Sequence, residues 1–293
     1  MVKIISDSTC DLSRELLEKH DITILPLHIV LGDKEYLDGV NITPDEIYQW
    51  SDANKTTPKT SAASMEDVTA AFAPYVKEQR EIVCFCISGE MSVTANVMRM
   101  AARELEAEDL IHVIDSRNLS TGIGLQVLEA AEMAEAGKSG QEIEEAILAL
   151  QPKVRASFVV DTLTYLYRGG RCSGLEAMAG GMLKLHPKIE VKDGVMGSSK
   201  KYRGKIDKVI LSYARDMEED LKNARAKRVF ITHSGCDQAV LDQVWEYVEG
   251  LHHFDEILMT RAGSVISSHC GPGTLGACLS RSRGSAALWL NRR

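Results

Sequence analysis

The sequence predicts an α/β fold of two α/β domains, the first of which has a parallel sheet flanked by helices. Short apolar runs alternate with helical segments along the first half, which is typical of strands joined by crossover helices. The chain of 293 residues, of which 44% are hydrophobic, is also long enough for two domains with separate cores. A linker at Gln151-Pro152-Lys153 would divide the chain into domains of residues 1–153 and 154–293.

The elements of the first half follow from its apolar runs and its helix-capping residues. The predicted strands are residues 2–5, 22–31, 82–87 and 111–114. Helices are predicted over residues 11–20, from 94 through 106, and after 122 toward 150. Two more helices should start at Thr43-Pro44-Asp45-Glu46 and Ser64-Met65-Glu66-Asp67, because a capping hydroxyl precedes acidic residues there. A polar loop at residues 52–63 should connect them.

The second half opens with an apolar strand around residues 157–161 and then alternates strands with helices as far as Leu290. Residues 189–197 are typical of a β-hairpin, because Asp193-Gly194 provides the pair that favours a tight two-residue turn. This half is therefore predicted to be a second α/β domain.

Composition argues against several classes of protein. No apolar run approaches the roughly 18 to 20 residues of a membrane-spanning helix, and the first residues lack the apolar region of a secretory signal, so we expect a cytoplasmic protein without an integral membrane segment. The seven cysteines are scattered and odd in number, which fits a reducing compartment. The only close Cys/His pairs are Cys84/Cys86 and His269/Cys270, so no metal site is expected.

Charge differs between the two halves. Residues 1–150 carry 12 Lys/Arg against 27 Asp/Glu (net −15), and residues 151–293 carry 22 against 15 (net +7), which together give −8. Aromatic residues make up only 5%, and no aromatic-interleaved basic stripe is present, so a nucleic-acid partner is not expected. The basic half indicates either a charged protein partner or simple solvation.

Polar residues follow three of the predicted strands, at Asp7-Ser8-Thr9, Ser88 to Ser92 and Asp115-Ser116. Ligands of open parallel sheets collect at the carboxyl ends of the strands, so these loops are candidates for a binding site. For a single loop hydroxyl, helix capping is the simpler explanation.

Several motifs in fixed order then suggest a family. They are Ser6 to Leu12, Thr60-Ser61, Ser88 to Thr94, Asp115 to Glu129, Phe158 to Ser173, Val191 to Gly194, Lys201 to Lys205, and His269 to Thr274. In this order the chain resembles the DegV family, the fatty-acid-binding subunits that serve bacterial fatty acid kinase. The resemblance implies a lipid carrier without a cofactor, with one long-chain fatty acid lying between the domains and catalysis residing in the separate, ATP-binding kinase. Departures from the family pattern are Ala62-Ala63, Val93 and the Arg- and Ser-rich tail from Leu279 to Arg293.

The resemblance also implies roles for individual residues. Thr60, Ser92 and His269 should hold the carboxylate by hydrogen bonds, and Ser61 should lie beside them. The loop from the second domain should be shaped by Gly271 and Thr274. Arg171 and Arg203 should face the kinase.

Two alternatives remain open at this point. A serine hydrolase could use Ser92 and His269, although Glu90-Met91-Ser92-Val93-Thr94 is not the Gly-x-Ser-x-Gly of a nucleophile elbow. A kinase-related domain could bind ATP itself, although the chain has no Gly-x-x-x-x-Gly-Lys-Ser/Thr loop.

Overall fold

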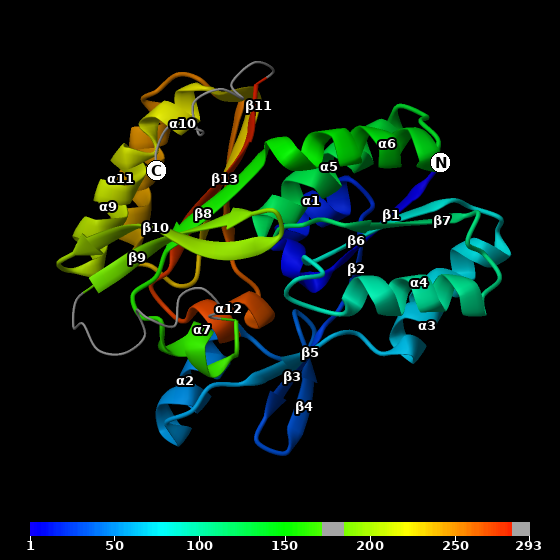
Figure 1. Ribbon diagram of the computed structural model, residues 1–293, viewed down its shortest axis with the longest axis horizontal. Coiled ribbons are helices and arrows are strands. Elements are labelled where there is room, and N and C mark those ends of the chain that lie inside the picture. The colour runs from blue at the N-terminus through cyan, green and yellow to red at the C-terminus, as the bar shows by residue number, and fades with distance from the viewer. Residues whose placement is uncertain (172–184, 283–293) are drawn as a thin grey trace.

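A computed structural model describes residues 1–171 and 185–282 (Figure 1). The end of the family motif at Ser173 and the tail from residue 283 to 293 lie outside these described residues. Among the described residues, no helix is long and apolar enough to cross a membrane.

The first half is built on a parallel sheet, as predicted. Its strands, in the spatial order β2-β1-β6-β7, are β1 (Lys3–Asp7), β2 (Thr23–Leu25), β6 (Ile82–Cys86) and β7 (Ile111–Asp115). The helices of this half are α1 (Arg14–Lys19), α3 (Met65–Lys77), α4 (Thr94–Glu104), α5 (Thr121–Glu135) and α6 (Gly140–Leu150). Figure 1 shows α5 and α6 on one face of the sheet and α3 and α4 on the other. Strand residues alternate between the two cores, since Ile4 packs toward α5 whereas Ile5 packs toward α3 and α4.

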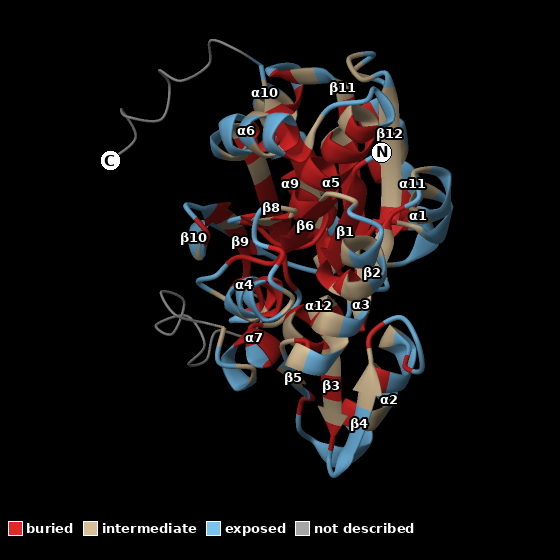
Figure 2. Cartoon of the chain, turned by 90° about the vertical axis from the view of Figure 1, so that its right-hand side faces the viewer, coloured by how far each residue is buried: buried red, intermediate tan, exposed pale blue. Residues whose placement is uncertain are grey.

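A small antiparallel sheet follows in the order β4-β3-β5, and it corrects two predictions. Residues 22–31 form two strands, β2 and β3 (His28–Leu31), because Pro26 lies between them and cannot donate to a ladder. The loop predicted at residues 52–63 contains the end of α2 (Pro44–Asn54) and the strand β5 (Lys59–Ser61), which pairs with β3. The hairpin partner of β3 is β4 (Lys34–Leu37). Figure 2 shows β4 at one end of the molecule, away from the buried centre.

The second half forms a six-stranded mixed sheet. Its strands, in the order β10-β9-β8-β13-β11-β12, are β8 (Val154–Val159), β9 (Leu185–Lys192), β10 (Val195–Arg203), β11 (Ala224–His233), β12 (Glu256–Arg261) and β13 (Leu275–Arg281). Only β11 and β12 are parallel neighbours. The helices α9 (Ile206–Asp216), α10 (Glu218–Lys222) and α11 (Gln238–Glu249) cover one face (Figure 1). The hairpin of β9 and β10 turns at Asp193-Gly194, as predicted.

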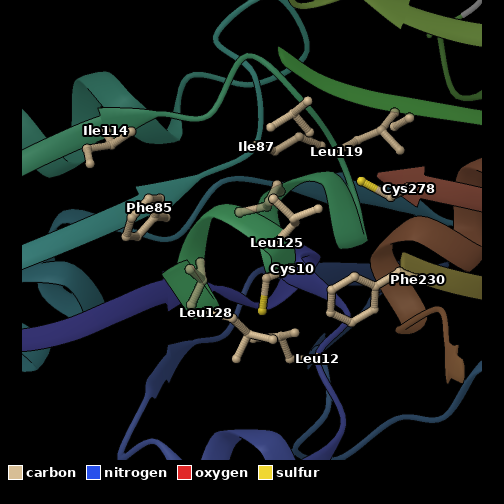
Figure 3. Packing of buried hydrophobic residues seen from close by; sticks show 14 of the residues in the cluster. Cys10, Leu12, Phe85, Ile87, Ile114, Leu119, Leu125, Leu128, Phe230 and Cys278 are labelled. Atoms are coloured by element: carbon tan, nitrogen blue, oxygen red, sulfur yellow. The ribbon is translucent and has the colours of Figure 1, made fainter. Parts of the chain in front are cut away.

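Helix α5 joins the two sheets. It packs on β1 and β6 of the first sheet and also contacts β8, β13 and β11 of the second. Figure 3 shows Leu125 and Leu128 of α5 among Phe85, Phe230 and Cys278, which belong to three different strands. One continuous apolar cluster therefore spans both halves, so burial of this surface stabilises their relative placement.

The described part of the chain has four further helices, which are η1 (Ser8–Cys10), η2 (Gln151–Lys153), α7 (Thr164–Arg168) and α12 (Ser264–Cys270). Helix α12 belongs to the second half but contacts α2 and β5 of the first. Its start is held by two buried carboxylates of the first half, because Asp11 accepts a hydrogen bond from the Gly263 N–H (2.8 Å) and Asp38 accepts one from the Ser264 N–H (2.7 Å). These bonds fix the direction in which α12 delivers its last turn.

Candidate functional site

A cavity lies between the two halves, at the carboxyl ends of β1 and β6. It contains about 970 Å³ of space free of protein atoms, part of which is open to solvent. Apolar atoms form most of its surface, and half of its lining residues have apolar side chains: Leu27, Ala62, Ile87, Met91, Leu119, Ala156, Phe158, Leu166, Met196, Ala262, Val265, Ile266, Cys270, Ala277 and Cys278. A cavity with this lining fits a ligand with a long apolar body.

Thr60 and His269 form the polar pair of this cavity. Thr60 comes from β5 of the small sheet and His269 from the last turn of α12, so each half of the chain provides one partner. The Thr60 Oγ1 atom lies 2.8 Å from the His269 Nε2 atom. Both side chains line the cavity, so a hydroxyl and an imidazole are available to the same ligand group.

His269 is held as a neutral imidazole. Burial and, to a smaller extent, the positive charge of Arg171 together lower the pKa of His269 to about 4. The Nδ1 atom is enclosed and has no hydrogen-bond partner among residues 1–171 and 185–282. At neutral pH the ring therefore has one N–H donor and no charge.

Two glycines make room for this arrangement. A Cβ atom placed on Gly169 would lie 2.3 Å from the His269 Nδ1 atom, so the backbone of the loop after α7 packs directly against the imidazole. A Cβ atom on Gly271, whose φ is +71°, would lie 2.6 Å from the ring of Tyr165. Gly169 thus belongs to the support of His269, which the sequence did not indicate.

Ser92 and Ser61 also line the cavity. The Ser92 hydroxyl lies 2.9 Å from the Thr94 hydroxyl and accepts a 3.3 Å hydrogen bond from the Thr94 N–H at the start of α4. Among the described residues, no hydrogen bond joins Ser92 to His269, and no carboxylate contacts Nδ1 of His269. This geometry does not activate Ser92 as a nucleophile of the Ser-His-acid kind.

Gly271 and Thr274 lie in the turn that follows α12. Thr274 lines the cavity, and its hydroxyl donates to the Cys270 carbonyl oxygen (3.0 Å). Gly271 does not line the cavity, but its carbonyl oxygen accepts a hydrogen bond from the buried Ser234 hydroxyl. Both residues therefore fix the turn that ends α12, which in turn holds His269 in place.

The two arginines that the sequence assigned to a partner differ in position. Arg171 lines the cavity, donates to the Gly169 carbonyl oxygen (2.8 Å) and reaches the Met91 carbonyl oxygen (3.4 Å). Arg203 is exposed at the end of β10 and does not line the cavity. No sequence motif predicted that Arg171 would lie near His269 in the cavity wall.

The polar loops after β1, β6 and β7 mostly bond to protein groups. Asp7 is fully buried and accepts hydrogen bonds from the Thr9 and Ile87 N–H groups, and burial raises the pKa of Asp7 to about 6. Ser88 donates to the Gly194 carbonyl oxygen (2.7 Å) and so fastens the β9–β10 hairpin to the first half. Helix capping and domain contact therefore explain most of these polar residues, whereas Thr9 and Ser92 line the cavity.

Among the described residues, no group of His, Cys, Asp and Glu is arranged to hold a metal ion. The described cysteines carry no disulfide, and Cys236 is the least buried of them.

The chain is similar to known proteins over nearly its whole length. Residues 1–282 match the DegV family, which is described as a family of uncharacterised proteins. A DegV domain-containing protein of Clostridium acetobutylicum is 36% identical, with 94% of this chain and 96% of that protein covered.

Two solved structures are similar in fold and sequence. A DegV family protein from Thermus thermophilus, described for its fatty acid binding, is 29% identical with a TM-score of 0.86, and 96% of this chain and 99% of that chain are covered. A stearic-acid-binding protein from Eubacterium ventriosum is 33% identical with a TM-score of 0.84, and 96% and 98% of the two chains are covered.

Proposed function

The chain belongs to the DegV family, and from this premise we propose that it binds one long-chain fatty acid in the cavity between its two halves. The observation that carries the proposal is a mainly apolar cavity into which the Thr60–His269 pair points from both halves. An acyl chain needs only apolar walls, whereas its carboxylate needs donors that replace water. Fatty acid binding by the Thermus thermophilus and Eubacterium ventriosum proteins supports the same assignment.

The arrangement of His269 suggests how the carboxylate is held. A proton on the enclosed Nδ1 atom would be a buried donor without an acceptor, so we place the proton on Nε2, which then donates to Thr60 Oγ1. The Thr60 hydroxyl proton is then free to point at a carboxylate oxygen. Ser92 is the second hydroxyl donor of this scheme, with Ser61 at the rim.

Arg171 supplies the only cation of the cavity wall among the described residues. A guanidinium near the head group favours the ionised form of a fatty acid over the protonated one. In this proposal Arg171 helps to hold the carboxylate, and the exposed part of its side chain also faces the partner.

We further propose that the chain is a carrier and that a partner fatty acid kinase phosphorylates the bound carboxylate to an acyl phosphate. This step rests on the family resemblance and on Arg203, which is exposed and free to meet an acidic surface. The hydrolase alternative is not favoured, because Ser92 bonds to Thr94 and His269 bonds to Thr60.

A titration of delipidated protein with palmitate and with hexadecanol tests the binding proposal. Both ligands have the same tail, so only the head group differs. The proposal expects palmitate to bind more tightly by at least about 10-fold, since charge-assisted hydrogen bonds contribute roughly 1.5 to 3 kcal/mol. Equal affinities for the two ligands would show that the polar pair does not recognise a carboxylate.

A further inference from the structure

The structure has a second hollow. Strand β8 lies between this hollow and the fatty-acid cavity. It contains about 1430 Å³ of space that is open to solvent. Residues of η2, β8, the β9–β10 hairpin, α10 and the loop after β7 form its wall. Ala156 and Ser157 belong to the walls of both hollows, so strand β8 separates them.

Basic side chains dominate this second hollow. Its five basic residues are Arg117, Arg155, Lys188, Lys192 and Arg281, and its three acidic residues are Glu190, Asp193 and Asp220. The excess of two positive charges occurs in a chain whose net charge is −8. The surplus is therefore local and does not reflect the charge of the whole molecule.

Two of the three acidic residues form ion pairs with basic residues of the same hollow. Glu190 pairs with Lys188 (2.9 Å), and Asp220 pairs with Arg281 (3.1 Å). Asp193, at the hairpin turn, offers its backbone carbonyl oxygen to Arg117 (3.0 Å). Among the described residues, neither the Arg117 nor the Arg155 guanidinium has a carboxylate within 4.0 Å, although the Arg117 backbone N–H donates to the Asp115 carboxylate (2.9 Å).

Arg155 lines the hollow, and backbone groups hold its guanidinium. Its Nη1 atom donates to the carbonyl oxygens of Pro152 (2.8 Å) and Val154 (2.9 Å), which fixes the guanidinium in place. Its Nε and Nη2 groups make no hydrogen bond within the described part of the chain. Arg155 lines the hollow, so an anion that enters it can accept charge-assisted hydrogen bonds from these donors.

A second guanidinium, that of Arg281, acts on Arg155 from the same face of the sheet. Arg155 pairs with Leu279 across the sheet, so Arg281, two residues further along β13, lies on the same face as Arg155. Burial and the positive charge of Arg281 lower the pKa of Arg155. The carboxylates of Asp220, Asp193 and Glu190 act on Arg155 in the opposite direction, and among the described residues none of them lies within 4.0 Å of its guanidinium.

The shape and lining of the hollow indicate the class of ligand. Arg117 comes from the first half and Arg155 from the second, so the donors approach from two sides, which suits a phosphoryl group with several acceptor oxygens. Apolar groups lie beside them, including Leu148, which is 50% exposed, Pro152 and Met217. A phosphate ester with an apolar body would contact both kinds of side chain.

We propose that this hollow binds a small phosphate-bearing organic anion, with Arg155 and Arg117 holding the phosphoryl oxygens from the two halves. This site is distinct from the fatty-acid cavity, from which strand β8 separates it. Because both halves contribute a donor, the bound anion would bridge the same two units that enclose the acyl chain.

Calorimetric titration of the full-length protein with inorganic pyrophosphate at low salt tests this site. We expect binding in the micromolar to low millimolar range, and a loss of about 10-fold or more in the Arg155→Met variant, which keeps the aliphatic stem but removes the charged donors. Arg99→Met is the matched control, because exposed Arg99 on α4 carries the same charge and its side chain, within the part of the chain that the structure describes, bonds only to Asn96 (3.4 Å). Its affinity for pyrophosphate should match that of the wild type.

Further measurements separate the possible results. If Arg155→Met melts early, Arg117→Met, at an exposed position of the other half, provides the same test. Citrate in place of pyrophosphate should bind more weakly, and tighter citrate binding would overturn the phosphate assignment. The site does not exist if the wild type fails to bind pyrophosphate at 10 mM, or if Arg99→Met and Arg155→Met weaken binding equally. A parallel palmitate titration of Arg155→Met should be unchanged, so either proposal can fail without the other.

Discussion

The Thr60 Oγ1 atom and the His269 Nε2 atom lie 2.8 Å apart although 209 positions separate them in the chain. One belongs to a three-residue strand and the other to a seven-residue helix, and neither element has a core of its own. The pair forms because Asp11 and Asp38 hold the start of α12 against the first half. The head-group site is therefore a product of how the two halves are joined.

Replacement of Thr60 by valine should weaken fatty acid binding without unfolding the protein. The change keeps the side-chain shape but removes the hydroxyl, so affinity should fall by about 1 to 3 kcal/mol, or roughly 5- to 150-fold. Titration of delipidated variants with palmitate measures this loss. Thr69→Val is the control, because the buried Thr69 hydroxyl has no hydrogen-bond partner among the described residues. Equal affinity of both variants and the wild type would remove Thr60 from the head-group site.

Replacement of Gly169 by alanine should displace the His269 ring or the loop by a steric clash. The added methyl group would lie 2.3 Å from Nδ1, so the imidazole or the loop must move, at a cost of about 1 to 3 kcal/mol in the free energy of unfolding. Gly197→Ala is the control, because nothing lies within 4 Å of the added carbon there.

A double-mutant cycle isolates the contact between Gly169 and His269. In a His269→Ala background the ring is absent, so Gly169→Ala should cost much less stability than it does in the wild type. Chemical denaturation of the four proteins gives the coupling energy. Strict additivity would mean that Gly169 does not support the imidazole.

The stability of the ligand-free protein should depend on pH through His269. Its pKa is about 4 when folded against an ordinary value of 6.5, so the unfolded state takes up a proton first as the pH falls. The contribution of His269 is therefore complete above about pH 6.5 and is lost as the pH falls toward 4, by as much as about 3 kcal/mol.

The His269→Gln variant separates this effect from that of the buried acids. Burial raises the pKa of Asp7 to about 6 and that of Asp11 to about 8, which gives the opposite dependence, with stability lost as the pH rises. Those contributions are common to both proteins. The difference in unfolding free energy between wild type and His269→Gln should therefore decrease between pH 6.5 and pH 4, and a constant difference would contradict a neutral, buried ring.

Charge reversal of the two arginines should separate ligand binding from docking. Arg203→Glu should reduce acyl phosphate formation with the kinase, most at low salt, and leave palmitate affinity unchanged. Arg171→Glu should reduce both, because Arg171 lines the cavity and would place a second negative charge near the carboxylate. Arg215→Glu, exposed on α9, is the control for charge alone. Loss of palmitate binding in Arg203→Glu, or unchanged docking in both variants, would contradict these roles.

Much of the fold could be predicted because the responsible signals are local. Apolar runs such as residues 82–87 indicate buried strands, Thr43 and Ser64 form the expected capping boxes, and Asp193-Gly194 makes the hairpin turn. The small sheet could not be predicted, because β5 consists of Lys59, Thr60 and Ser61 and has no apolar alternation. It forms through pairing with β3, which is a tertiary contact.

Sequence motifs indicated polar residues of the candidate site but not the residues that pack around them. Family motifs indicated Thr60, Ser92 and His269, all of which line the cavity. No sequence pattern states that Gly169 packs against the imidazole or that Arg171 lies in the wall, since both follow from the turn after α7 meeting α12. The pair of guanidiniums at Arg155 and Arg281 likewise depends on the register of β8 against β13.

Mass spectrometry of an organic extract from the purified protein shows whether a fatty acid is bound. We expect about one equivalent of a fatty acid of roughly 14 to 18 carbons per chain, since an acyl chain of this length suits a mainly apolar cavity. The same extract from the Thr60→Val variant should contain clearly less. If the extract holds no fatty acid, and the protein also fails to take up palmitate when it is added, the chain does not carry a fatty acid.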